Sequence, residues 1–336
     1  MARCTLLTAD LLREICAFQD GHYEETLPIV RILYGGGKER PPNDHSIPQS
    51  EFSPADDAAF HALFEPWLRT HRLRGLRRLL ASTGDASNRL VLYAARYGNL
   101  GVLRGLGHRV RDVADDAVWA VAAEHGRVRL LRFLRSHGYD ASSVSAAMER
   151  AAAFGRTAVL RFLCRHFGPP RSAWPLTFAC NGGHVGAVRE LYPYHAQAPN
   201  LLRGAAAAGH LGVVCCLDRL GYASDGTDEM DLAAAHGHLS VVAYLDRHGR
   251  GGCSARAMDL AAAHGHLAVV RYLHEHRSEG CTTDAINGAV VGGHTAVVAF
   301  LLAHRPEGFT PQAVLNAAAN AAIWALLTAH RAAGDA

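Results

Sequence analysis

The chain has 336 residues, a length that fits two ordinary domains or one elongated array of small repeats. Hydrophobic residues make up 49% of it, and because Ala, Leu and Val supply most of them, the composition favours closely packed helices over a sheet. A formal net charge of +3 is too small to indicate a nucleic-acid binder, and no apolar run approaches the roughly 20 residues that a membrane-spanning helix needs.

The use of cysteine and lysine bears on the cellular compartment. The eight cysteines lack the compact spacing of a disulfide framework, and the first residues lack the apolar core of a signal peptide, so we expect an intracellular, cytoplasmic protein. Of the 34 basic residues 33 are Arg, and Lys38 is the single lysine. GC-rich coding explains this bias; avoidance of ubiquitin-acceptor lysines beside a ubiquitin ligase is the alternative.

Two short helices are predicted near the start, over residues 6–18 (LLTADLLREICAF) and 27–35 (LPIVRILYG). The first is similar to the opening of an F-box, whose pattern is Leu-Pro-x-Glu-Leu-Leu-x-x-Ile. The proline is absent, and Asp10 stands for the glutamate. The resemblance implies a substrate receptor of a cullin-type ubiquitin ligase, docked to a Skp1-type adaptor. The residues that would dock the adaptor are Leu7, Leu11, Leu12 and Ile15.

The alternative interpretation of residues 1–34 is a helix pair that only caps the rest of the chain. Residues 35–57 have the Gly, Pro and Ser content of a linker. We therefore expect a second domain that spans residues 58–336.

From about residue 58 the chain repeats itself with a period near 28 residues. The frame A-A-x-x-G-[HNR]-[LVT]-x-V-V-x-x-L occurs eight times. One degenerate copy stands at each end, where His71 and Ala319 replace the glycine; eroded end copies are expected because terminal repeats face water on one side. The glycines of the frame are Gly98, Gly126, Gly155, Gly183, Gly209, Gly237, Gly265 and Gly293.

Each repeat predicts two short helices, for example over residues 257–265 and 266–276. The alanine run of the first helix permits close packing, and Leu267, Val270 and Leu273 give the second helix an apolar stripe of helical period. The glycine between them suits a helix end in the left-handed conformation. One pair cannot bury its own apolar faces, but stacked pairs can. The predicted fold is therefore all-α, an α-solenoid with short turns between repeats.

The frame also contains polar residues that suit a structural role. Ser254 and Thr282 stand where a first helix needs an N-cap. The histidine after each glycine sits in the turn between the helices, where we expect it to bond backbone groups. Equivalent histidines of adjacent repeats are separated by a helix-packing distance of about 8–10 Å, too far to share one zinc ion. We therefore predict no metal. These histidines are His210, His238, His266 and His294.

The repeat resembles the ankyrin repeat, in which Thr-Pro-Leu-His opens the first helix, Ala-Ala and Gly-His follow, and Val-Val-x-x-Leu lies in the second helix. WPLTFAC (174–180) is the closest match to the opening. In the other repeats that opening is mostly replaced, and the period is about five residues shorter than usual, so the fingers between repeats should be short turns. Such short repeats look like the divergent arrays abundant in giant viruses and some protists; for a viral protein this implies the host cytoplasm. The best matches to the rest of the pattern are Ala233, Ala234, Gly237, His238, Val241, Val242 and Leu245.

The ankyrin resemblance implies a non-enzymatic scaffold that binds a partner protein through a concave face lined by the first helices. Positions just before each glycine vary between repeats, as a binding surface on a constant frame would; drift on a solvated face is the alternative. The chain has no Gly-rich phosphate loop, nucleophile elbow or HExxH, and we predict no catalytic residue and no cofactor. The candidate binding residues are Arg96, Tyr97, Glu124, His125, Phe154, Asn181, His236 and His264.

Arginines are concentrated between Arg69 and Arg111, where ten of them accompany one acidic residue, Asp85. A solvated face at the end of the array explains them. Contact with an acidic partner or a nucleic acid is the alternative, since such a patch attracts anionic surfaces. We do not expect a nucleic acid to be the partner.

The F-box resemblance generates the first prediction. Full-length protein should co-precipitate with a Skp1-type adaptor, and deletion of residues 1–34 should abolish this while leaving the helical circular-dichroism spectrum of the repeats in place. Full-length protein that ignores the adaptor would exclude the ligase hypothesis.

Overall fold

The computed structural model describes most of the chain from residue 54 onward and a few residues before it. The residues predicted to dock an adaptor, Leu7, Leu11, Leu12 and Ile15, lie outside the described residues. The residues described before residue 54 include one antiparallel pair, β1 (Phe18–Gln19) and β2 (His22–Tyr23), so Phe18, predicted as the last residue of the helix 6–18, lies in a strand. Residues 29–30, within the helix predicted at 27–35, are helical. The described residues are 18–19, 22–23, 26, 29–30, 54–83, 87–111, 115–222, 226–249 and 252–334.

From residue 54 the described chain is all-α, as predicted, and it divides into two compact units, residues 1–147 and 148–336. No helix in the described ranges is long and apolar enough to cross a membrane. Unit 1 contains α3 (Pro54–Ser82), α4 (Ser87–Tyr97), α5 (Leu100–Leu106), the 3-10 helix η2 (Gly107–Val110), α6 (Asp116–Glu124) and α7 (Val128–Ser136), and the boundary falls inside α8 (Ser145–Ala153).

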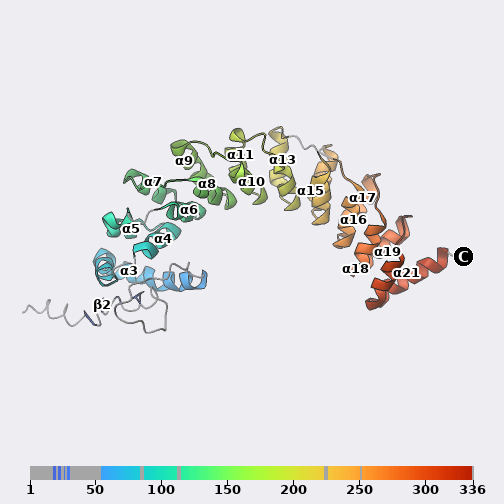
Figure 1. Cartoon of the computed structure of the whole chain (residues 1–336), viewed down its shortest axis with the longest axis horizontal. Coiled ribbons are helices and arrows are strands. Elements are labelled where there is room, and N and C mark those ends of the chain that lie inside the picture. Colours follow the sequence, from blue (N-terminus) through green and yellow to red (C-terminus); the bar gives the residue numbers. More distant parts are fainter. Residues whose placement is uncertain are drawn as a thin grey trace, which may run out of the picture. The chain divides into compact units, whose positions relative to one another are not determined.

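Unit 2 continues the alternation of short helices (Figure 1). Its helices are α9 (Thr157–Phe167), α10 (Trp174–Asn181), α11 (Val185–Leu191), η3 (Tyr192–Tyr194), α12 (Leu201–Ala207), α13 (Leu211–Arg219), α14 (Asp228–Ala235), α15 (Leu239–Arg247), α16 (Ala255–Ala263), α17 (Leu267–His276), α18 (Thr283–Val291), α19 (Thr295–His304), α20 (Pro311–Asn316), η4 (Ala317–Ala319) and α21 (Ala321–Gly334).

Helix α3 begins within the segment predicted as a linker. It begins at Pro54, so the last four residues of the predicted linker 35–57 are helical; proline suits a first turn because the N–H that it lacks has no partner there. Two helical segments meet in α3 at Arg72, whose φ is 48° and ψ is −146°. The degenerate first repeat is therefore a helix pair like the others, with its positive-φ residue one place after His71.

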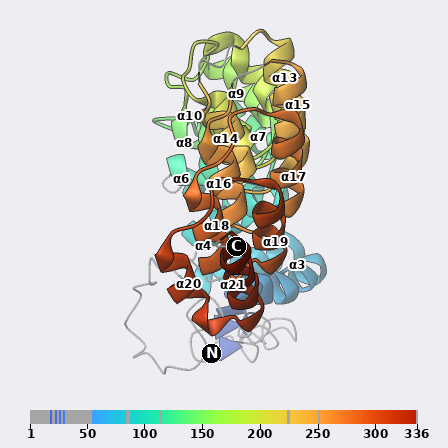
Figure 2. The ribbon, with the colours of Figure 1, turned by 90° about the vertical axis from the view of Figure 1, so that its right-hand side faces the viewer.

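The helices of unit 2 form two layers (Figure 2). The first helices pack on one another in the order α10, α12, α14, α16, α18 and α20, and the second helices pack in the order α9, α11, α13, α15, α17, α19 and α21. We call these the first-helix layer and the second-helix layer. Apolar side chains of unit 2 are thus buried between neighbouring helices of the two layers.

The predicted turn is confirmed at the frame glycines. The first helix predicted at 257–265 is α16, and it ends one residue before the turn His264–Gly265. All eight frame glycines have φ between 66° and 79°, a region where a Cβ is unfavourable. The alanine run allows close packing as predicted: a Cβ on Gly288 of α18 would lie 2.7 Å from the Cβ of Ala263 in α16.

The predicted stripe of the second helix is partly wrong. In α17, Val270 and Leu273 are buried, but Leu267 is half-exposed and Val269 is buried in its place. The two adjacent valines, Val269 and Val270, are both buried. The buried residues of a second helix in this two-layer stack therefore cover more of the helix surface than the single apolar stripe of an amphipathic surface helix does.

Histidine side chains connect successive repeats. The Nε2–H of His238 donates to the carbonyl oxygen of Ala207 at 3.0 Å, and that of His210 donates to Asn181 at 2.9 Å. The sequence predicted backbone bonds for these histidines; the structure shows that the carbonyl belongs to the end of the first helix in the preceding repeat. That helix end has carbonyls without an intrahelical partner, so each histidine caps its neighbour.

The same imidazole also lies over the glycine of the preceding repeat. A Cβ on Gly209 would come within 2.5 Å of His238, and the equivalent contact recurs between Gly265 and His294. In unit 1 an arginine takes this place: Arg127 donates from Nε to the carbonyl oxygen of Arg96 at 2.8 Å and lies 3.0 Å from the position of a Cβ on Gly98. The frame glycine therefore serves both the turn and the side chain stacked on it.

A second set of bonds joins adjacent first helices near their N-termini. Asp259 of α16 accepts from the backbone N–H of Thr282 at 2.7 Å and from its hydroxyl at 2.9 Å. The Thr282 hydroxyl also accepts from the N–H of Asp284, so the predicted N-cap is confirmed and is itself held by the preceding repeat. Bonded pairs of this kind include Asp231 with Ser254, Asp259 with Thr282, and Asn287 with Thr310.

The two histidines of one His-Gly-His segment provide a matched test of this cap. Replacing His238 with Ala leaves the Ala207 carbonyl unpaired and should lower the free energy of unfolding by about 1–3 kcal/mol. His236 is exposed, and its replacement with Ala should change that free energy by no more than about 0.5 kcal/mol. Urea unfolding of both variants, followed by circular dichroism, measures the difference; equal losses would contradict the proposed division between the two histidines.

Candidate functional site

The candidate binding residues of unit 1 are engaged within the protein. Arg96 forms an ion pair with Asp57 of α3, and the Tyr97 hydroxyl donates to the same carboxylate at 3.0 Å. The Tyr97 ring also stacks on His61, with 3.9 Å between the ring centroids. These contacts hold the degenerate first repeat against α4, so Arg96 and Tyr97 contribute to packing in unit 1.

Glu124 and His125, at the end of α6, are half-buried. The Nδ1–H of His125 donates to the carbonyl oxygen of Val121, one turn earlier, at 3.0 Å. This bond orients the ring along its own helix and leaves Nε2 as the remaining acceptor of the neutral imidazole.

The candidate residues of unit 2 are exposed: Phe154, Asn181, His236 and His264 all lie at the surface. Asn181 covers the neighbouring first helix, because a Cβ on Gly204 would overlap with its Oδ1. Unit 2 therefore contains the exposed members of the predicted set, and the first-helix layer to which they belong is the candidate surface.

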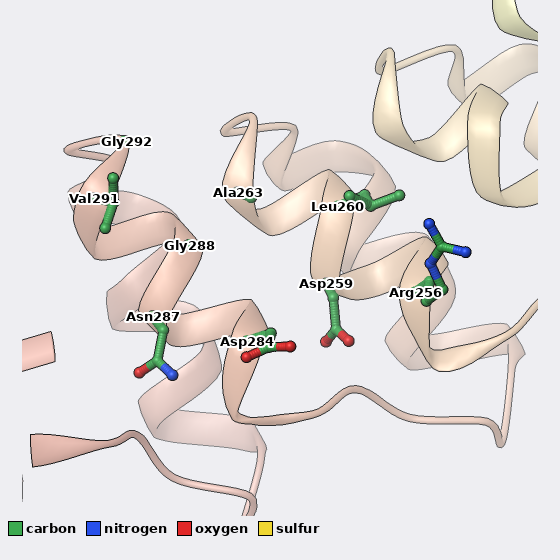
Figure 3. A pocket seen from close by; sticks show the side chains of 9 residues that line it. All are labelled: Arg256, Asp259, Leu260, Ala263, Asp284, Asn287, Gly288, Val291 and Gly292. Carbon is green, nitrogen blue, oxygen red and sulfur yellow. The ribbon is translucent and has the colours of Figure 1, made fainter. Parts of the chain in front are cut away.

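A groove opens on this layer between α16 and α18, with a volume of about 540 Å³ (Figure 3). It begins one residue before the predicted His264 and extends away from the turn, over the two preceding helical turns. Gly288 lines the groove where α18 packs closely on Ala263 of α16. The lining residues are Arg256, Asp259, Leu260, Ala263, Asp284, Asn287, Gly288, Val291 and Gly292.

The charged groups of the groove differ in availability. Asp284 points from α18 toward Asp259 of α16 (Figure 3). Asp259 is buried and bonded to Thr282; burial raises the pKa of its carboxyl, and the two bonds from Thr282 act against that rise. Asp284 and Arg256 are exposed at the rim. The groove thus offers one carboxylate and one guanidinium around the apolar side chains of Leu260 and Val291.

An exposed aromatic pair lies on the same layer at α10. Trp174 is 61% exposed and Phe178 is 36% exposed, and their rings stack with centroids 6.0 Å apart. Phe154, 44% exposed, precedes them by one repeat. The sequence interpretation used Trp174 only to align the repeat and did not select this pair. The sequence could have indicated this pair. Leu176 and the alanine frame occupy the inner face of α10, so positions 174 and 178 must lie on the outer face.

Four histidines gather at the turns that follow α14 and α16. The ring centroids of His236 and His238 are 6.2 Å apart, as are those of His264 and His266. Throughout the part of the chain that the structure describes, no three His, Cys, Asp or Glu side chains are placed to hold one metal ion. Backbone carbonyl oxygens bind these rings instead, as they do at His238 and His264.

Burial raises the pKa of four described thiols, Cys164, Cys180, Cys253 and Cys281. Burial raises the pKa of Cys180 to about 12 and that of Cys281 to about 11, so both remain protonated at neutral pH. The first-helix layer exposes both apolar and polar side chains. No protein-family model and no curated protein matches the sequence.

His266 generates a prediction on pH. Burial lowers its pKa, and the neighbouring His264, His236 and His238 lower it further, while its bond to the Ala235 carbonyl acts in the opposite direction. The unfolded chain therefore takes up this proton at a higher pH than the folded chain. The contribution to stability is complete above about pH 6.5 and is lost as the pH falls through the lower folded value.

Melting temperatures at pH 7.5 and pH 5.5 measure this effect. Acidification should lower the melting temperature of the wild type more than that of His266→Gln, because the glutamine amide does not titrate. If the melting temperature of the variant falls as much as that of the wild type, protonation of His266 does not cause the loss of stability.

Proposed function

We propose that this protein is a non-enzymatic scaffold built as an ankyrin-like solenoid, and that it binds a partner protein through the first-helix layer of unit 2. The observation that carries the proposal is the exposed aromatic pair Trp174 and Phe178. Large apolar side chains that are left in water on a helix face are typical of protein interfaces, where aromatic residues supply much of the binding energy.

The division of labour within the repeat supports this proposal. Side chains that recur in the frame form hydrogen bonds inside the stack. His238 donates to the carbonyl oxygen of Ala207, and Asp259 accepts from the N–H of Thr282. Residues that point outward from the same helices differ between repeats: Phe178 of α10, Leu260 of α16 and Gly288 of α18 are equivalent positions five residues before the frame glycine. A constant frame with a variable outer face is the arrangement expected of a scaffold that recognises one partner.

Further apolar exposure lies on the same layer at its other end. Val291 at the end of α18 is 70% exposed and Leu315 in α20 is 68% exposed. With the groove between α16 and α18, these residues extend the surface over several repeats. A partner would therefore contact apolar residues at α10, the groove, and the region of α18 and α20, separated by small side chains.

The ligase hypothesis concerns a different part of the chain. It would add an adaptor at residues 1–34 and make the protein bound by the repeats a substrate for ubiquitination. The single lysine, Lys38, favours it, since a receptor with few lysines escapes modification of itself.

Crosslinking from the aromatic pair tests the scaffold function. A photo-crosslinking amino acid at position 178 of the full-length protein should identify the partner, and the same amino acid at position 220 serves as the control. Leu220 ends the second helix of its repeat and is 39% exposed, so its surroundings are comparable but lie on the other layer.

Calorimetry with the purified partner then gives the affinity. Replacing Trp174 and Phe178 with Ala should raise the Kd at least tenfold, a loss of about 1.4 kcal/mol or more, and Leu220→Ala should leave it unchanged. Because these side chains are exposed, the melting temperature should stay close to that of the wild type. A partner captured equally at both positions, or an affinity insensitive to the double variant, would contradict the proposal.

A further inference from the structure

Charge is sorted between the two helix layers of unit 1. The second helices of its repeats are residues 73–82 of α3, α5 with η2, and α7. These segments contain no acidic residue. The first helices, residues 54–71 of α3, α4 and α6, contain the acids Asp56, Asp57, Glu65, Asp116 and Glu124. The arginines of the second helices are Arg74, Arg77, Arg78, Arg104, Arg109, Arg129, Arg132 and Arg135.

The general preference of this chain for arginine does not explain that sorting. In unit 2 the second helices α11, α13, α15 and α17 carry Arg189, Arg219, Arg247 and Arg271. They also carry Glu190, Asp218, Asp246 and Glu275, so in these four helices four positive charges are matched by four negative ones. Helix α9 has Arg161 and Arg165 and no acid, but Arg161 pairs with Glu190 of α11. A coding bias would enrich arginine in both units, but it would not leave every second helix of unit 1 without an acid.

The repeat places several of these arginines at equivalent positions. Arg77, Arg104 and Arg132 each follow a buried leucine of the second helix, and all three are exposed. Helices of successive repeats pack about 8–10 Å apart, which sets the spacing of this row. Arg129 adds an exposed guanidinium one turn before Arg132 in α7. We call Arg77, Arg104, Arg129 and Arg132 the arginine row.

The guanidinium groups of the arginine row are not used for folding. In the part of the chain that the structure describes, none of the four makes a hydrogen bond or an ion pair. The contrast within unit 2 is direct, because Arg161 occupies the same repeat position and lies 3.2 Å from Glu190. The row therefore presents fixed positive charge to whatever binds this layer.

The surroundings of the row indicate the chemistry of that ligand. Leu73 is the one large hydrophobic side chain that this layer exposes in its described residues. A protein interface needs apolar anchors at its centre, and a membrane surface is usually engaged by inserted apolar or aromatic side chains. The phosphate backbone of a nucleic-acid duplex can be bound by charge alone, and the planar guanidinium matches the geometry of a phosphate.

We propose that the second-helix layer of unit 1 binds the phosphate backbone of double-stranded nucleic acid through the arginine row, without reading its sequence. A duplex carries one negative charge per about 1.7 Å of its axis, so guanidinium groups one helix apart meet phosphates in any register. This differs from the expectation drawn from the net charge of +3, because that sum averages the layer with the acids of the rest of the chain.

The test uses the full-length protein and 30-base-pair duplexes of DNA and of RNA, with fluorescence anisotropy measured over a range of salt concentrations. Four phosphate contacts predict a plot of log K against log salt with a slope of about −3 to −4. Replacing Arg77, Arg104 and Arg132 with Gln should weaken binding at least tenfold and reduce that slope by about 3. Binding of only one duplex type would still support the proposal and would identify the natural source of the phosphates.

The matched control replaces Arg161 and Arg189 with Gln, at the same repeat position in unit 2. This variant should keep the affinity and the salt slope of the wild type. Parallel measurements use polyglutamate and vesicles that contain phosphatidylserine. The proposal is overturned if the duplexes do not bind at 50 mM salt, if the triple variant binds them like the wild type, if the control loses as much, or if only polyglutamate or the vesicles bind.

Discussion

The carbonyl groups at the end of each first helix need partners, and in unit 2 the next repeat provides them. A histidine that follows the frame glycine extends back by about one period and donates to that helix end, as His238 does to Ala207. The imidazole fits only because the glycine beneath it has no Cβ. Gly and His in the frame are therefore one structural feature shared by two repeats, and the period, the turn and the close packing of the first helices all depend on it.

The repeats, their helix pairs and the inward role of the frame could be predicted because a residue that recurs every 28 positions has the same surroundings each time. The sequence could not show whether His210 bonds to the preceding or to the following repeat, since a regular spacing is the same in both directions. Burial of Val269 in place of Leu267 was missed for a related reason: an amphipathic stripe describes a helix with one covered face, whereas a second helix in the stack has two. Trp174 and Phe178 were missed because an alignment to a repeat directs attention to the positions that conform.

The two units expose different chemistry on different layers. In unit 2 the first-helix layer has exposed apolar groups at Trp174 and at Val291, which lines the groove, and four of its second helices, α11, α13, α15 and α17, each carry one arginine and one acid. In unit 1 Arg96 and Tyr97 are occupied by α3, and the second helices are purely basic. The same 28-residue frame thus supports two unlike surfaces, because exposed residues such as Trp174 and Arg132 are not needed for the stack.

The backward reach of the histidines has a consequence for synthesis of the chain. His210 lies 29 residues after Asn181, and His238 lies 31 residues after Ala207. A helix end that has just left the ribosome therefore remains uncapped until about one further repeat has been translated. The growing chain becomes stable one repeat behind its point of emergence, so a pause in translation would leave the most recent helix pair as the part open to chaperones and proteases.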